Sequence, residues 1–289
     1  MSHNASSLSR WASPCRNNMK VIEQYTEGKS TTVPSEDAAV VTAFYAAVID
    51  GATPKTDFRY PGGETPGHLA ARLLSEAMRT MPADLDAEGC VARLTKVLHQ
   101  DNVEPSNRPI ASLVIYSEPR REIWMIGDCQ FGYIDGENIF RTVTNTKLID
   151  KCLSEWRRDI ILSYLSRGRM TAEGIAANDP GRRIIQPFIT HQVRYQNAKT
   201  QNPFNYTMLD GEPVPKHYIK VYQLPADVHQ LVLATDGYPV LMQNLEESEK
   251  ELHHLLHEDP LCIGPLLGTK GVQPGNKSND DRTYLRLEI

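Results

Sequence analysis

The amino-acid sequence predicts an α+β protein in which antiparallel sheets pack against helices. The predicted helices occur in consecutive pairs between runs of strands, whereas a parallel sheet would alternate strands and helices one by one. Several strand candidates are apolar along most of their length, which is typical of strands buried in a core. Residues 19–289 contain no internal repeat and no dividing linker, so we expect a single domain, preceded by a loose polar leader at 1–18.

The predicted strands are runs of apolar and β-branched residues, bounded by stretches of Gly, Pro and Asn. Residues 38–50 form a long apolar run that can hold one strand or two. The segment 51–67 is dense in Gly and Pro, so we expect irregular structure there. The expected strands lie within 19–28, 38–50, 110–117, 122–128, 131–136, 219–224, 230–236 and 283–289.

Four segments place their apolar residues on one helical stripe, and Asp86 is a predicted N-cap for the second. We expect 68–81 to pair with 87–100, and 148–166 to pair with 245–258. The long segment 167–218 is polar and contains scattered Gly, Pro and Asn. Because long loops in compact domains are usually functional or disordered, we expect it to form a flap or irregular insertion near the functional site.

The composition is that of an ordinary globular protein and limits the classes of partner. The chain of 289 residues is 40% hydrophobic and 23% charged, with a net charge of -5 and a pI near 6.0. This balance indicates neither nucleic acid nor an anionic membrane as a partner. No apolar run is long enough to span a membrane, and the five cysteines are scattered without a CxxC pair. We therefore expect a cytoplasmic protein with reduced thiols.

Acidic residues stand at the ends of the predicted apolar strands. A single case is most simply a turn, but several carboxylates at one edge of a sandwich would repel one another unless a cation lay among them. Oxygen ligands select hard ions such as Mg²⁺ or Mn²⁺, and two such ions together can activate water and bind phosphate. The positions are Asp50, Asp128 and Asp236 after strands, with Glu36-Asp37 and Asp280-Asp281 before them.

Six short motifs are each weak alone, but their order and spacing are specific. They are SED (35–37), IDGAT (49–53), GGETPGHLAARLLSEAM (62–78), IWMIGDCQ (123–130), LVLATDG (231–237) and NDDRTYLRLEI (279–289). In this order they resemble the metal-dependent protein phosphatases, the type 2C or PPM family, over about residues 19–289. The resemblance implies a four-layer αββα sandwich of two antiparallel sheets flanked by helix pairs. It also implies a binuclear Mg²⁺ or Mn²⁺ centre at one edge of the sheets.

By position in these motifs, the resemblance implies a set of metal ligands. Asp50 would bridge the two ions, and the Gly51 carbonyl would help to hold one of them. Asp236 and Asp280 would complete the other. Asp280 is favoured over its acidic neighbour because Thr283 follows it three places later, as a threonine does in the family.

The resemblance further assigns Glu36 and Asp37 to the second ion, directly or through ordered water, and Asp128 to a weaker third ion. The implied activity is hydrolysis of phosphate monoesters by a metal-activated water molecule. The implied partners are a phosphorylated protein or a small phosphoester, with no nucleic acid and no membrane.

The sequence departs from the family pattern where substrate phosphate is bound. Thr32 stands where the family has an arginine that grips the phosphate, and Gln130 replaces the arginine of the GDSR motif. Lys29 and Arg59 are the candidates for the missing phosphate contact, and the alternative is that both are solvated. The alternative function is a pseudophosphatase, a binding or regulatory module with the same fold and weak or no catalysis.

Overall fold

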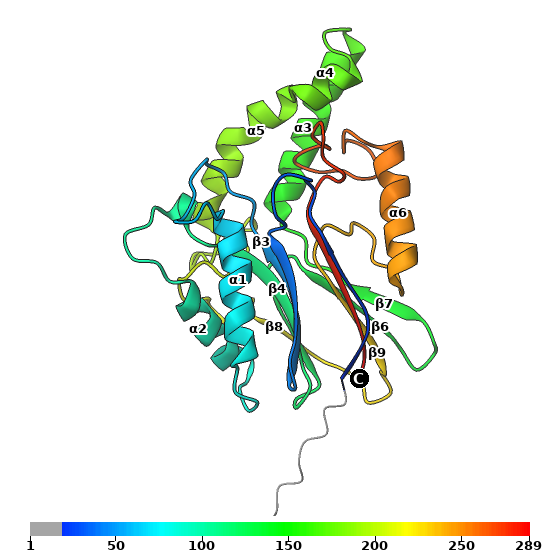
Figure 1. Cartoon of the computed structure of the whole chain (residues 1–289). Helices are drawn as coiled ribbons and strands as arrows, with labels where there is room; N and C mark the ends of the chain where they lie inside the picture. The colour runs from blue at the N-terminus through cyan, green and yellow to red at the C-terminus, as the bar shows by residue number, and fades with distance from the viewer. Residues whose placement is uncertain (1–18) are drawn as a thin grey trace, which may run out of the picture.

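The structure is a computed structural model that describes residues 19–289 (Figure 1), so the predicted leader at 1–18 lies outside the described residues. Two five-stranded antiparallel sheets pack face to face, which confirms the predicted α+β sandwich. The first, here the β3 sheet, has the order β2 (Asp37–Val41), β3 (Tyr45–Gly51), β4 (Ala111–Ser117), β5 (Glu122–Ile126) and β8 (Lys220–Gln223). The second, the β9 sheet, has the order β1 (Lys20–Glu27), β10 (Arg282–Glu288), β9 (Gln230–Ala234), β6 (Gln130–Ile134) and β7 (Phe140–Val143).

Strand β3 contributes to two cores at once. Its residues Ala46 and Val48 pack between the sheets, whereas Ala47 and Ile49 pack on the opposite face against helices α1 (Pro66–Arg79) and α2 (Ala87–Leu98). Because successive side chains point to opposite faces of a sheet, a strand covered on both sides is apolar throughout. Helix α6 (Leu245–Glu258) covers the outer face of the β9 sheet and completes the four layers.

The helix starts follow local capping chemistry. Thr65 precedes Pro66 at the start of α1 and its hydroxyl accepts a hydrogen bond from the His68 amide at 3.1 Å. The predicted N-cap Asp86 accepts one from the Gly89 amide at 2.8 Å. These bonds satisfy amides that have no partner within the helix.

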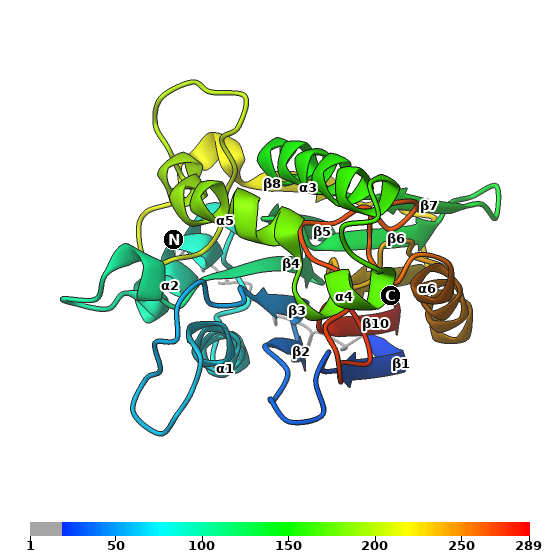
Figure 2. The same ribbon diagram turned by 90° about the horizontal axis from the view of Figure 1, so that it is seen from above.

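Helix α3 (Leu148–Ser166) has a different partner from the one expected. Its apolar residues Ile149 and Leu153 pack against Ile185 and Ile189 of α5 (Pro180–His191), so the expected pairing of 148–166 with 245–258 is corrected. Together with α4 (Ala172–Ala177), these helices lie over one end of the sheets (Figure 2). An amphipathic stripe shows that a helix has a buried face but does not identify the element that covers it.

The segment 167–218, expected to be a flap or irregular insertion, contains regular structure. It includes α4, α5 and the 3-10 turns η2 (Gln192–Tyr195) and η3 (Lys216–Tyr218). A further 3-10 turn, η1 (Pro105–Asn107), precedes β4. Pro187 lies inside α5, which explains why this segment did not suggest a helix. No helix within 19–289 combines the length and apolar character needed to cross a bilayer.

Candidate metal centre

The antiparallel registers bring the acidic strand ends to one end of the sandwich. Asp37 in β2 lies opposite Asp50 in β3, and Asp50 lies opposite Ser112 in β4. Asp128 follows β5, and Asp236 follows β9. One carboxylate oxygen from each of Asp50, Asp128 and Asp236 lies within 4.8 Å of the others, and we call these three residues the open lobe.

The carboxylates of the open lobe are poorly compensated. Burial, followed by repulsion from Asp37 and Asp128, raises the pKa of Asp50 well above its usual range. Desolvation in the cleft, followed by repulsion from Asp50 and Asp128, raises the pKa of Asp236 in the same direction. Within residues 19–289 the Asp236 carboxylate has neither a hydrogen-bond nor an ion-pair partner.

Asp236 nevertheless remains accessible to solvent, although the sequence places it at the end of an apolar strand. Strand β9 ends at Ala234, so Asp236 lies beyond the buried part of the sheet. Complete burial of an unpaired charge therefore does not explain this residue, although the surrounding cleft still desolvates its carboxylate. Repulsion among three neighbouring carboxylates is the force that a bound cation would relieve.

The donor set of the open lobe fits a hard divalent cation. It offers only carboxylate oxygens, which suit Mg²⁺ and Mn²⁺. The Oδ2 atom of Asp128 pairs with the Lys147 ammonium at 2.7 Å, while its Oδ1 atom is buried without a hydrogen-bond partner in the described part of the chain. Asp37, which lies opposite Asp50, accepts a hydrogen bond from Thr235 at its Oδ2 atom at 2.7 Å, and its Oδ1 atom likewise has no partner among residues 19–289. A buried carboxylate oxygen without a donor is a position where a cation or ordered water is favourable.

Asp280 has a different environment from the open lobe. Its Oδ1 atom pairs with Lys29 at 3.1 Å and its Oδ2 atom with Lys270 at 2.8 Å, so both oxygens already contact an ammonium group. Burial alone would raise the pKa of Asp280, but Lys270 and Lys29 outweigh it and hold the pKa well below its usual range. Asp128, and not Asp280, thus joins Asp50 and Asp236 in the tight carboxylate set.

Lys29 lies within a second acidic group, formed by Glu36, Asp280 and Asp281, which we call the lysine lobe. The Lys29 ammonium is 3.1 Å from a carboxylate oxygen of each aspartate and 3.6 Å from one of Glu36. The side chain is only 17% exposed, so Lys29 is not a solvated loop lysine. It is also committed to carboxylates, which leaves phosphate binding by Lys29 as a prediction without geometric support here.

Gly51 is required by the close approach of three backbone segments. A Cβ atom at Gly51 would come within 2.5 Å of the Glu36 carbonyl oxygen and 2.3 Å of that of Gly67. The Gly51 amide donates to the Glu36 carbonyl at 3.0 Å, and the Glu36 carboxylate accepts a hydrogen bond from Thr65 at 2.5 Å. The start of α1 therefore fixes Glu36 beside the end of β3.

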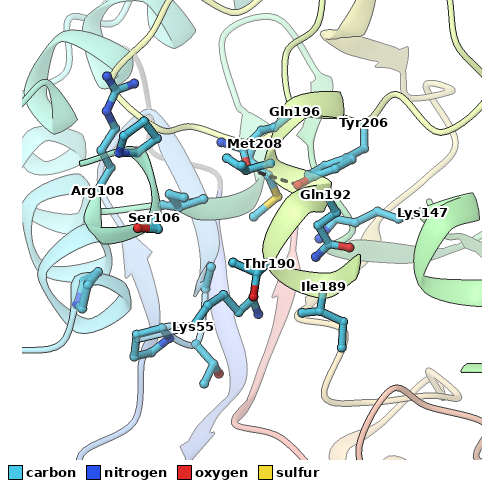
Figure 3. A pocket seen from close by; sticks show the side chains of 17 residues that line it. Lys55, Ser106, Arg108, Lys147, Ile189, Thr190, Gln192, Gln196, Tyr206 and Met208 are labelled. Atoms are coloured by element: carbon cyan, nitrogen blue, oxygen red, sulfur yellow. Dashed lines mark hydrogen bonds between the residues drawn. The ribbon is translucent and has the colours of Figure 1, made fainter. Parts of the chain in front are cut away.

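A cleft of about 160 Å³ opens onto both lobes. Its charged lining comprises five carboxylates and four cations, which are Asp50, Asp128, Asp150, Asp236, Asp280, Lys55, Lys147, Arg182 and Lys270. Figure 3 shows Lys55 and Lys147 among the side chains of an adjoining hollow of about 90 Å³. Arg59 is exposed and its guanidinium donates to the Phe58 carbonyl at 2.7 Å, so it does not line the cleft in this conformation.

The sequence interpretation missed the basic side chains of the cleft. Lys55 lies in the irregular segment 51–67, directly after the predicted ligands Asp50 and Gly51, and this position was the one available signal. Lys147 lies immediately before α3, Arg182 in the first turn of α5, and Lys270 in the loop after α6. No motif or spacing connects these residues along the chain.

No family model matches the chain, and no curated protein matches it by sequence. Among solved structures, the chain is similar to the serine/threonine phosphatase Stp1 from Staphylococcus aureus, with 12% identity over 96% of this chain and 99% of that one, at a TM-score of 0.49. It is similar to the serine/threonine phosphatase PstP/Ppp of Mycobacterium tuberculosis, with 16% identity over 94% and 98% of the two chains, at a TM-score of 0.46.

A further similar structure is the PstP catalytic domain in complex with two manganese ions, with 15% identity over 93% and 97% of the two chains, at a TM-score of 0.47. At such identities the likeness concerns the fold alone. The fold of this chain is the αββα sandwich that the sequence resemblance to the PPM phosphatases implies.

Proposed function

We propose that this protein is a Mg²⁺- or Mn²⁺-dependent phosphatase that hydrolyses phosphate monoesters, either phosphoserine and phosphothreonine side chains or a small phosphoester. The observation that carries the proposal is the convergence of Asp50, Asp128 and Asp236 at the mouth of a cleft lined with cations. When bound, the metal would act as a Lewis acid toward phosphate oxygens and would lower the pKa of the water molecule that it binds. The carboxylates of the open lobe would hold it.

The cations of the cleft replace the missing phosphate-binding arginine in this proposal. Arg182 is the best candidate, because a guanidinium can donate two parallel hydrogen bonds to a phosphate. Its Nη1 atom donates to the Thr269 carbonyl at 3.1 Å, which orients the group. Lys55 lines the same cleft and adds a point charge, and repulsion from Arg182 and Lys270 adds to desolvation in lowering its pKa to about 8.

Asp150 is the candidate proton donor to the leaving oxygen. It lines the cleft together with Asp236 and Asp280. Burial raises the pKa of Asp150, and Lys147 opposes that shift only in part. A carboxyl with a raised pKa retains its proton closer to neutral pH and can act as a general acid.

The direct test is hydrolysis of an aryl phosphate with and without Mn²⁺, with Asp236→Asn as the matched isosteric variant. We expect Mn²⁺-dependent turnover in the natural chain and its loss in the variant. Because the Asp236 carboxylate has no hydrogen-bond or ion-pair partner among residues 19–289, we expect the substitution to leave the fold intact. Turnover that is unchanged by removing Mn²⁺, or equal in the variant, would refute the proposal.

A pseudophosphatase is the second candidate, and one observation favours it. Lys29 and Lys270 occupy both oxygens of Asp280, a position that the sequence resemblance assigns to a metal ligand. If these ammonium groups reduced metal binding, the cleft would bind phosphorylated partners without hydrolysing them. Binding of a phosphopeptide with no turnover at millimolar Mn²⁺ would select this alternative.

A further inference from the structure

The two acidic lobes differ in whether the protein itself supplies a cation. In the open lobe, Asp128 has an ion-pair partner, Lys147, whereas Asp50 and Asp236 have none among residues 19–289. In the lysine lobe, the Lys29 ammonium lies within 3.6 Å of all three carboxylates, and Lys270 pairs with the second oxygen of Asp280. The open lobe therefore has two carboxylates without a cation beside them, whereas every carboxylate of the lysine lobe already has one.

The hydrogen bonds of Lys29 are complete. An ammonium group has three donors, and those of Lys29 are matched by Thr53 at 2.9 Å and by Asp280 and Asp281 at 3.1 Å each. A Mg²⁺ or Mn²⁺ ion at this position would need carboxylate oxygens at about 2.0–2.2 Å. The carboxylates would therefore have to move closer to one another, and the Lys29 ammonium would have to leave. The observed spacing is that of an ammonium site.

The backbone around Lys29 holds the ammonium in position. The Lys29 amide donates to Asp281 Oδ1 at 2.7 Å, and the Lys29 carbonyl accepts from the Lys277 amide at 2.8 Å. Ser30 and Asn276 form an isolated antiparallel bridge beside it. Lys29 is therefore fixed at both its backbone and its side chain, and Asp281 binds both ends of the same residue.

We infer that this centre holds a single divalent ion on the open lobe and that the Lys29 ammonium takes the place of a second ion in the lysine lobe. This inference rests on the metal binding in the proposed function, but it concerns the number of ions and the residues that hold them. Asp280 then acts as an electrostatic partner of two lysines and not as a metal ligand. This inference gives one ion, whereas the sequence resemblance implies two.

The test is Mn²⁺ binding by calorimetry together with electron paramagnetic resonance, which distinguishes isolated Mn²⁺ from an exchange-coupled pair. We expect the natural chain to bind one equivalent with the spectrum of isolated Mn²⁺. Lys29→Met removes the ammonium at similar volume, and we expect it to bind a second equivalent and to give a coupled spectrum. Lys20→Met is the control, because the Lys20 side chain is 75% exposed and pairs with the exposed Glu288.

A second variant keeps the test decisive if Lys29→Met does not fold. Asp280→Asn should still bind one equivalent, because Asp280 is not a ligand in this arrangement, whereas Asp236→Asn should lose at least about 100-fold in affinity. Two equivalents in the natural chain, or loss of the ion in Asp280→Asn, would overturn the inference. One bound ion without phosphatase activity would instead refute the proposed function and leave the inference intact.

Discussion

Replacing Arg157 with methionine should strongly destabilise this protein. Arg157 is 1% exposed in α3, and its Nε atom pairs with Asp179 at 2.7 Å, itself 8% exposed. The guanidinium also donates to the carbonyls of Cys262 and Gly268 at 2.9 Å each and of Leu261 at 2.7 Å. One side chain thus joins α3, the start of α5 and the loop after α6.

The expected magnitude follows from what the substitution leaves behind. Removing one partner of a buried ion pair costs about 3–5 kcal/mol, because the other charge stays buried without compensation. The three carbonyls lose a charged donor, but some of them can rebind to water, so we expect a total near the upper end of that range. Total stability is typically about 5–15 kcal/mol, so Arg157→Met should remain folded with a small margin.

The assay is urea unfolding followed by circular dichroism, with Arg158→Met as the matched control. Arg158 is the next residue on the same helix and pairs with Asp159 at the surface, so its loss should change stability by less than about 1 kcal/mol. The double variant Arg157→Met, Asp179→Asn should recover part of the loss, because no buried charge remains. If Arg157→Met cost no more than the control, the buried arginine would not stabilise this region as argued.

Three further predictions concern the cleft. Arg182→Met should raise the KM for an aryl phosphate about tenfold or more, because a charged hydrogen bond is lost. Arg183→Met, which replaces the exposed neighbouring arginine, should leave the KM unchanged. Equal KM values of the two variants in steady-state assays would contradict the assigned role. Asp150→Asn should lower kcat for alkyl phosphates far more than for nitrophenyl phosphate, whose leaving group needs no proton; equal losses in paired assays would exclude Asp150 as the acid. The raised pKa values of Asp50 and Asp236 mean that these carboxyls keep their protons to a higher pH than usual, so protons should compete with Mn²⁺. The affinity for Mn²⁺ measured by calorimetry should therefore increase with pH. An affinity that is flat or falls with pH would argue against these ligands.

The sequence alone determined the layered fold and the positions of the acidic strand ends. Strand and helix periodicity are local, so the apolar run of β3 and the stripe of α1 can be recognised without knowing their partners. A strand that alternates Ala46 and Val48 with Ala47 and Ile49 must be covered on both faces. Asp50 and Asp236 follow such runs directly, so the end of the sandwich that carries carboxylates was predictable.

Only the tertiary structure decided which cations meet those carboxylates. Lys29 contacts Asp281 across 252 positions of the chain. The loop that carries Lys270 is bound to α3 by Arg157 and lines the same cleft. A lysine in a loop has the same local sequence signature whether it is solvated or buried against carboxylates, because its long side chain responds to the packed environment and not to its neighbours in sequence. The difference between the open lobe, in which two carboxylates lack a cation, and the lysine lobe, in which Lys29 contacts all three, therefore depends on tertiary packing.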